Sequence, residues 1–273
     1  MDLTLLKLAA FAYLFATVSF TLYLVLLRDF LSRFSPAVLL AGFVIHTTAL
    51  GLASFQTGYP AVTQPQEALS FFCWVMVGVY LVVQLKYRIT VLGSIIAPLA
   101  FLMSFSAFAF GPGSGELPPG LKTYWLPFHI TFAFLGNAVF ALAFGVSLMY
   151  LAEEYQLKKK KMRILYRRFP SLETLDRLNY MFLVWGFPLM TLGIITGSLW
   201  AGVHWGDYWS WEPRQIASTI AWLFYGALLH GRITAGLRGK KAAFLTIVGF
   251  AVVLGYFLWG DAVFPNRHSG RFE

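Results

Sequence analysis

The sequence has little charge and almost no cysteine. Asp, Glu, Lys and Arg make up 12% of its 273 residues, whereas a soluble domain carries about 25%. The single cysteine, Cys73, rules out an internal disulfide and any CxxC redox or zinc motif. Its place in an apolar run favours a packing role over a reactive thiol. The sequence also lacks a GxGxxG fingerprint, a P-loop and an HExxH motif, so it offers no nucleotide or zinc-protease chemistry.

What the sequence has is apolar residues, at 58% of the chain. One water-soluble core cannot hide so much apolar surface, so we expect an all-α polytopic membrane protein. A spanning helix needs about 20 apolar residues. Eight runs approach that length, and the seventh is the shortest: residues 8–27, 37–55, 68–85, 89–110, 125–150, 181–200, 215–230 and 242–259. The first run lacks the basic flank of a signal peptide and should stay as a helix. We therefore expect a single integral membrane domain over residues 1–273.

The basic residues alternate between the two sides of the predicted bundle. Sixteen Lys and Arg residues follow runs one, three, five and seven, and five lie on the other side. Because basic residues stay cytoplasmic, both termini and the loop between runs six and seven should face outward from the cytoplasmic membrane. The net charge of +9 lies in short clusters between apolar runs, which argues against nucleic acid.

The longest charged segment covers residues 158–177. A topology anchor on anionic membrane lipid is the favoured interpretation. A docking surface for a cytoplasmic partner is the alternative.

A tryptophan-rich loop, at about residues 202–215, separates runs six and seven. It combines flat rings with acidic residues and a cation: Trp205, Trp209, Trp211, Glu212 and Arg214. Tryptophan also forms belts at membrane interfaces, and Trp125, Trp185, Trp200 and Trp259 need no other explanation. The loop exceeds what a belt requires. Aromatic surface beside an arginine, which can pair with a carboxylate through two hydrogen bonds, suits a planar apolar ligand with carboxylates. We expect that ligand to be haem.

Two histidines are predicted to lie on the same side as this loop. His129 opens the fifth run, and His268 lies in the C-terminal tail. Two neutral imidazoles on opposite faces of a porphyrin form a bis-histidine haem site, so both are candidate axial ligands. His204 adjoins the loop but is interpreted as an interfacial residue as readily as a pocket residue.

The other two histidines are predicted to lie within the bilayer, where ionisable groups are costly and commonly functional. His230 ends the seventh run, roughly 24 Å inward of Arg214 at 1.5 Å per residue, and His46 lies within the second run. They are candidate ligands of a second haem. For His46, a hydrogen bond to a neighbouring helix is the alternative.

These motifs together resemble one family. Residues 205–214 resemble the tryptophan-rich WWD signature of haem-handling proteins, with Glu212 in place of its Asp. The LHGR at residues 229–232 resembles an LHTR motif, and WLPFH at 125–129 resembles the segment of the first external histidine. QEAL at 66–69 and His268-Ser269 resemble the YESL and HSYG motifs. In order and spacing, the chain resembles the CcsA (ResC) family of cytochrome c assembly proteins.

The resemblance implies a function. Haem b would enter between transmembrane histidines, move to an external site lined by the WWD loop, and there become attached to the CxxCH cysteines of an apocytochrome c. The implied partner is a CcsB (ResB)-type membrane protein, and the pair would form a cytochrome c haem lyase or synthetase complex. In many members that partner supplies the second transmembrane ligand, which leaves His46 open. Two alternatives remain: a HemX-type haem-binding regulator of haem synthesis, and a transporter of another planar ligand.

Overall fold

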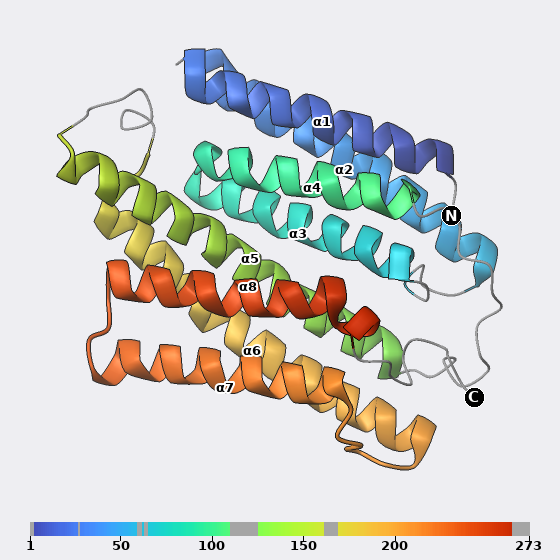
Figure 1. Cartoon of the computed structure of the whole chain (residues 1–273). Coiled ribbons are helices and arrows are strands. Elements are labelled where there is room, and N and C mark those ends of the chain that lie inside the picture. Colours follow the sequence, from blue (N-terminus) through green and yellow to red (C-terminus); the bar gives the residue numbers. More distant parts are fainter. Residues whose placement is uncertain are drawn as a thin grey trace. The chain divides into compact units, whose positions relative to one another are not determined.

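The computed structural model describes residues 3–26, 28–58, 62, 65–109, 125–160 and 169–263, and within these ranges it is all-helical. This confirms the predicted fold class. The elements are α1 (Leu3–Leu26), α2 (Asp29–Thr57), α3 (Pro65–Tyr87), the 3₁₀ turn η1 (Thr90–Leu92), α4 (Gly93–Ala109), α5 (Trp125–Lys158), α6 (Leu172–Trp205), α7 (Pro213–Thr234) and α8 (Lys240–Val263) (Figure 1).

Each of the eight predicted apolar runs corresponds to one α-helix, and in the fourth run the 3₁₀ turn η1 precedes that helix. Among the described residues, α1 to α6 are long and apolar enough to cross a membrane, so the chain is a multi-pass membrane protein. α7 is the most polar of the predicted runs, because its 22 residues include Gln215, His230 and Arg232. The orientation of the termini stays a prediction, and so does the single domain over residues 1–273.

Several helices extend beyond the runs that predict them. α2 begins at Asp29 rather than residue 37, α5 continues to Lys158 rather than 150, and α6 begins at Leu172 rather than 181. The start of α6 has a cap, because the Ser171 hydroxyl accepts a hydrogen bond from the Thr174 amide at 3.3 Å. Hydropathy marks the part of a helix that lies in the bilayer, whereas backbone hydrogen bonding continues into the polar region beyond it.

The chain divides into two compact units, which are described separately. The first comprises residues 1–117 and 155–170, and the second comprises residues 118–154 and 171–273. In the first unit, α1 packs against α2 and α4, and α3 packs against α2 and α4. Cys73 is fully buried there, and its Sγ donates to the Ala100 carbonyl at 3.3 Å. This contact fits the packing role expected from the sequence.

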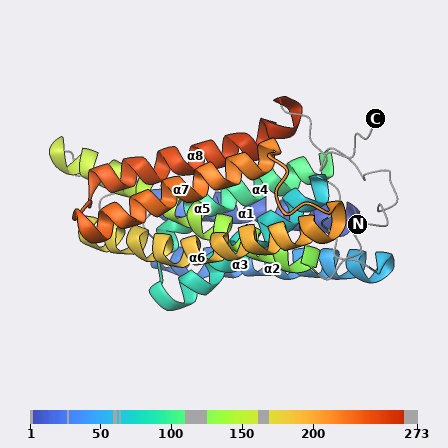
Figure 2. The ribbon, with the colours of Figure 1, turned by 90° about the horizontal axis from the view of Figure 1, so that it is seen from below.

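The second unit contains the tryptophan-rich loop. α7 packs against α6 and α8, and α7 and α8 lie side by side in both views (Figure 2). Glycines bring α5 and α6 into backbone contact. A Cβ on Gly136 would lie 2.9 Å from the Met190 nitrogen, and one on Gly193 would lie 3.0 Å from the Ala133 nitrogen. Small residues at such positions are typical of helix pairs in membranes, because they let the backbones approach closely.

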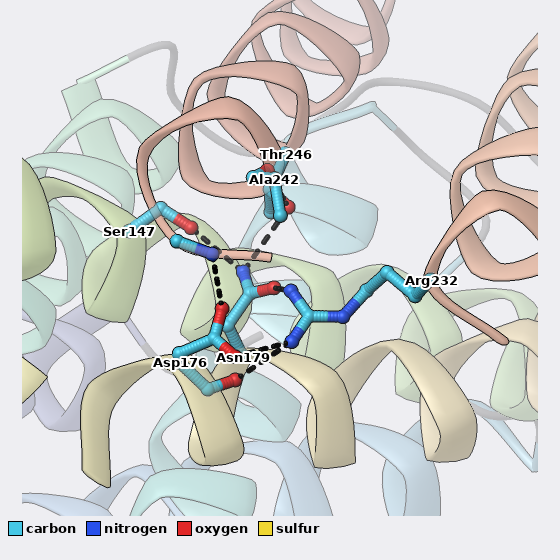
Figure 3. A network of polar contacts seen from close by, with 7 residues as sticks. Ser147, Asp176, Asn179, Arg232, Ala242 and Thr246 are labelled. Carbon is cyan, nitrogen blue, oxygen red and sulfur yellow. Dashed lines mark hydrogen bonds and ion pairs between the residues drawn. The ribbon is translucent and has the colours of Figure 1, made fainter. Parts of the chain in front are cut away.

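A buried polar cluster holds the second unit together at the end opposite its tryptophan-rich loop (Figure 3). Its centre is Arg232 of α7, whose side chain is 3% exposed. Nη2 donates to Asp176 Oδ2 at 2.8 Å, and Nη1 donates to Asn179 Oδ1 at 3.0 Å. The guanidinium carbon also lies 5.2 Å from the centroid of the Tyr180 ring, a distance that permits a cation–π contact. These contacts fix the end of α7 against the start of α6.

Asp176 and Asn179 extend this cluster to α5 and α8. Asp176 Oδ1 accepts a hydrogen bond from the Gly239 amide at 2.8 Å, just before α8 begins. Asn179 Nδ2 donates to Ser147 Oγ of α5 at 2.8 Å and to Thr246 Oγ1 of α8 at 3.1 Å. All four helices of the unit therefore share one hydrogen-bonded set, which we call the Arg232 cluster.

Candidate functional site

His129 lies one turn into α5, against the last third of α6. Its Nδ1 is 2.8 Å from the Gly193 carbonyl oxygen. A carbonyl can only accept, so Nδ1 carries the proton, and in the neutral ring Nε2 carries the lone pair. Among the described residues, no hydrogen bond engages Nε2. A histidine that donates through one nitrogen to a backbone carbonyl is oriented to bind a metal through the other.

Trp200 and His204 continue from His129 along α6. The His129 and Trp200 rings are parallel within 3°, with centroids 6.5 Å apart, and the Trp200 and His204 rings are 5.4 Å apart at 30°. We call these three residues the aromatic column. Trp200 is 3% exposed, so the interpretation of it as a lipid-facing belt residue is wrong. Its burial places a flat apolar wall beside the candidate ligand.

The tryptophan-rich loop is shorter than predicted, because α6 continues through His204 to Trp205. Gly206 ends the helix in the left-handed conformation, with φ of 83°. The chain then folds back along α6. Ser198 Oγ donates to the Tyr208 carbonyl at 2.7 Å, and the Tyr208 ring lies where a Cβ on Gly202 would clash at 2.5 Å. The loop is therefore held on the same helix that carries the aromatic column.

The second half of the loop is tied to α7 and presents its tryptophans. Gln215 Oε1 accepts hydrogen bonds from the Ser210 amide at 2.9 Å and from its hydroxyl at 3.3 Å. Trp209 and Trp211 meet edge to face with centroids 5.6 Å apart. Trp211 is 74% exposed and has φ of 56°, a conformation that costs a non-glycine residue about 1–2 kcal/mol. The backbone of Trp211 is thus strained, and its large apolar ring is exposed.

The start of α7 places positive charge beside the tryptophan-rich loop. Glu212 is a buried residue at the N-cap, its carbonyl accepts from the Ile216 amide at 3.0 Å, and Pro213 opens the helix. Arg214 is exposed in the first turn and lies within electrostatic reach of His129. A helix N-terminus carries partial positive charge, so the arginine and the helix favour an anionic group in the same region. This fits the propionates of haem.

The structure brings together part of the predicted site. His129, Trp209, Trp211, Glu212 and Arg214 all belong to the loop end of the second unit. His268 and the side chain of Trp205 lie outside the described residues. Their assignments as haem ligand and haem contact stay predictions.

The two histidines predicted within the bilayer have contrasting surroundings. His46 is fully buried in the first unit, with Nδ1 3.1 Å from Tyr13 Oη and Nε2 2.8 Å from Ser70 Oγ. These bonds correspond to the alternative of a hydrogen bond to a neighbouring helix. His230 is exposed on α7 in the second unit, two residues before Arg232. Iron ligation by either residue stays a prediction, and for His46 it would require loss of one hydroxyl partner.

Several residues of the site were missed by the sequence interpretation. Trp200 was assigned to a belt, and Ser198 and Gly197 were not considered. The spacing of Gly193 and Gly197 was an available signal, because small residues four apart mark close helix contacts in membranes. The back-folding of the loop onto Ser198 has no comparable signal, because it depends on a contact between residues ten apart.

These features define a class: a polytopic helical membrane protein with a tryptophan-rich loop and an oriented histidine at one end of a four-helix unit. The family model described as "Cytochrome C assembly protein" matches residues 62–260. The chain belongs to this family.

Named relatives cover most of the chain. It is 32% identical over 242 residues to the cytochrome c biogenesis protein CcsA of Guillardia theta, covering 82% of this chain and 80% of the relative. It is 33% identical over 239 residues to CcsA of Prochlorococcus marinus (strain MIT 9301), covering 78% and 76%. The solved structure of the cytochrome c heme lyase CcmF shares the fold, with a TM-score of 0.63 at 15% identity. That match covers 97% of this chain but about half, 49%, of the solved one.

The strained backbone of Trp211 leads to a prediction. Replacing Trp211 by glycine should raise the stability of the protein by about 1 kcal/mol, because glycine adopts positive φ without strain. If the loop covers haem, as predicted from the sequence, the same change should lower haem occupancy several-fold, because the exposed ring is lost. Thermal unfolding and the Soret absorbance per protein measure the two effects.

Trp185 on α6 provides the control for this variant. It is 65% exposed and is not part of the tryptophan-rich loop. Trp185→Ala should leave haem occupancy unchanged. Equal losses of haem in the two variants would mean that Trp211 has no particular role in the site.

Proposed function

We propose that the chain binds haem b on the outward face of the cytoplasmic membrane and presents it for covalent attachment to the CxxCH cysteines of an apocytochrome c. Membership in the cytochrome c assembly family supports the pathway. The observation that carries the haem site is His129, whose Nδ1 is bonded to the Gly193 carbonyl beside the tryptophan-rich loop. Nε2 is then the nitrogen suited to ligate iron.

Each part of the site has a role in this proposal. His129 and His268 would hold the haem iron. Trp205, Trp209 and Trp211 cover the apolar porphyrin, and Arg214 pairs with a propionate. Bound haem supplies the vinyl groups that react with cysteine thiols, and the chain contributes by positioning them. Glu212, buried at the start of α7, belongs to the same proposed haem-binding set.

A second haem position within the membrane is part of the proposal. His230 is exposed on α7, so a helix of another protein can approach its imidazole. A CcsB-type membrane protein is the proposed partner, and it would supply the opposing ligand. The Lys and Arg distribution supports placing His230 toward the cytoplasmic side and the tryptophan-rich loop outward. The basic segment 158–177, of which residues 161–168 lie outside the described residues, would then lie on anionic lipid.

The test is to delete the gene and stain membranes for covalently bound haem. We expect c-type staining to disappear and b-type haem to remain, and the purified protein, expressed with its partner, to show a low-spin bis-histidine spectrum. Unchanged c-type staining would contradict the proposal and favour a role in regulating haem synthesis. A colourless protein from haem-replete membranes would contradict haem binding itself.

A further inference from the structure

Gly197 occupies the point where the His129 ring meets α6. A Cβ at this position would lie 2.6 Å from both Cε1 and Nδ1 of the ring. Ring and backbone therefore fit together only because residue 197 has no side chain. The contact brings Nδ1 to the Gly193 carbonyl, one helical turn earlier, at 2.8 Å.

The same contact determines which nitrogen is free. The Gly193 carbonyl fixes the proton on Nδ1, and the Trp200 ring lies parallel to the imidazole with its centroid 6.5 Å away. Thr196 Oγ1 also approaches the Gly193 carbonyl, at 3.2 Å. A bulkier residue at 197 would move the ring away from this carbonyl and release both its orientation and its tautomer.

We propose that Gly197 and the Gly193 carbonyl are the positioning elements that set the orientation and tautomer of His129 as an axial haem ligand. This inference rests on the proposed function, because it assumes that His129 ligates iron. In this proposal both glycines act through the histidine and not on the haem itself. Partners of this kind change metal affinity by about 10–100-fold when they are lost.

The chain offers a matched control on the same helix. A Cβ on Gly186 of α6 would lie 2.6 Å from Cε1 of Phe140, an aromatic ring of α5. Gly186→Ala therefore introduces the same atom against the same kind of neighbour at the same distance. It does so 11 residues away, about 16 Å along the helix, and at no residue of the proposed haem site.

The experiment compares Gly197→Ala, Gly186→Ala and His129→Ala in the full-length protein purified with its partner. In Gly197→Ala we expect at least a tenfold loss of haem affinity, a shift of the remaining haem from low spin to high spin, and recovery of the low-spin spectrum with added imidazole. Gly186→Ala should keep the low-spin spectrum even where it lowers thermal stability. Nitrogen-15 NMR of haem-free protein labelled on histidine gives a second readout, with His129 protonated on Nδ1 in the wild type but not in Gly197→Ala.

The outcomes separate this inference from the proposed function. If His129→Ala keeps the wild-type haem spectrum, the assignment of His129 as a ligand fails. If His129→Ala loses the low-spin spectrum but Gly197→Ala keeps it, the assignment of His129 as a ligand is retained and the positioning role of Gly197 is overturned. Equal loss in Gly197→Ala and Gly186→Ala, without recovery by imidazole, would also overturn it, because the effect would be structural.

Discussion

Cells that carry His129→Ala in place of the wild-type protein are expected to retain less than about a tenth of their covalently bound c-type haem. The variant removes the one nitrogen of the loop end that is oriented by a backbone carbonyl and engages no hydrogen bond from the described residues. If His129 holds the haem iron as proposed, its loss would leave the iron without that ligand and the low-spin spectrum would disappear. Haem-stained gels measure the cellular effect, and optical spectra of the purified protein measure the ligation.

His204 provides a sharp control for this experiment, because it lies in the same aromatic column. His204→Phe keeps a flat ring against Trp200 but removes both nitrogens. We expect this variant to keep the low-spin spectrum and most of the c-type haem. Added imidazole should restore the spectrum of His129→Ala. The opposite pattern, with loss in His204→Phe and none in His129→Ala, would transfer the ligand role to His204.

The helices of this protein could be predicted from the sequence because each apolar run approaches the length of a membrane-spanning helix. Their ends could not, because hydropathy does not register helix that continues into the polar region. The loop illustrates the consequence. His204 and Trp205 were placed in a connection, yet they form the last turn of α6, and this helical turn stacks His204 on Trp200.

The residue types of the candidate site could be predicted from the sequence, but the contacts that orient them could not. Clustered tryptophans and a histidine at a helix start are visible in the sequence. By contrast, His129 and the Gly193 carbonyl are 64 residues apart, and a backbone carbonyl has no signature in the sequence. In the sequence, Trp200 cannot be distinguished from a tryptophan of a membrane-interface belt, and only its packing shows that it is buried. The features that the sequence interpretation missed therefore depend on contacts between residues that are distant in the sequence.

The second large effect is expected from Arg232→Met in the Arg232 cluster. Methionine keeps much of the apolar volume of the arginine side chain. It leaves the Asp176 carboxylate and the side-chain oxygen Oδ1 of Asn179 without the guanidinium that donates to them. Breaking a buried ion pair by removing one partner costs about 3–5 kcal/mol, and we expect a loss of about 3 kcal/mol here because the Asp176 side chain is 20% exposed. Unfolding of the detergent-solubilised protein by denaturant measures it.

Arg238 is the matched control, because it is an exposed arginine in the connection that follows α7. Arg238→Met should change stability by less than about 0.5 kcal/mol. The double variant Asp176→Asn with Arg232→Met should lose less than the sum of its single changes, because no unpaired carboxylate remains and Asn Oδ1 can still accept from the Gly239 amide. Equal stabilities of Arg232→Met and Arg238→Met would contradict the assigned role.

Since His230 lies two residues before Arg232, the cluster also fixes the helix face on which the proposed transmembrane ligand is presented. Arg232→Met should therefore weaken any haem held through His230 while the spectrum contributed by His129 persists.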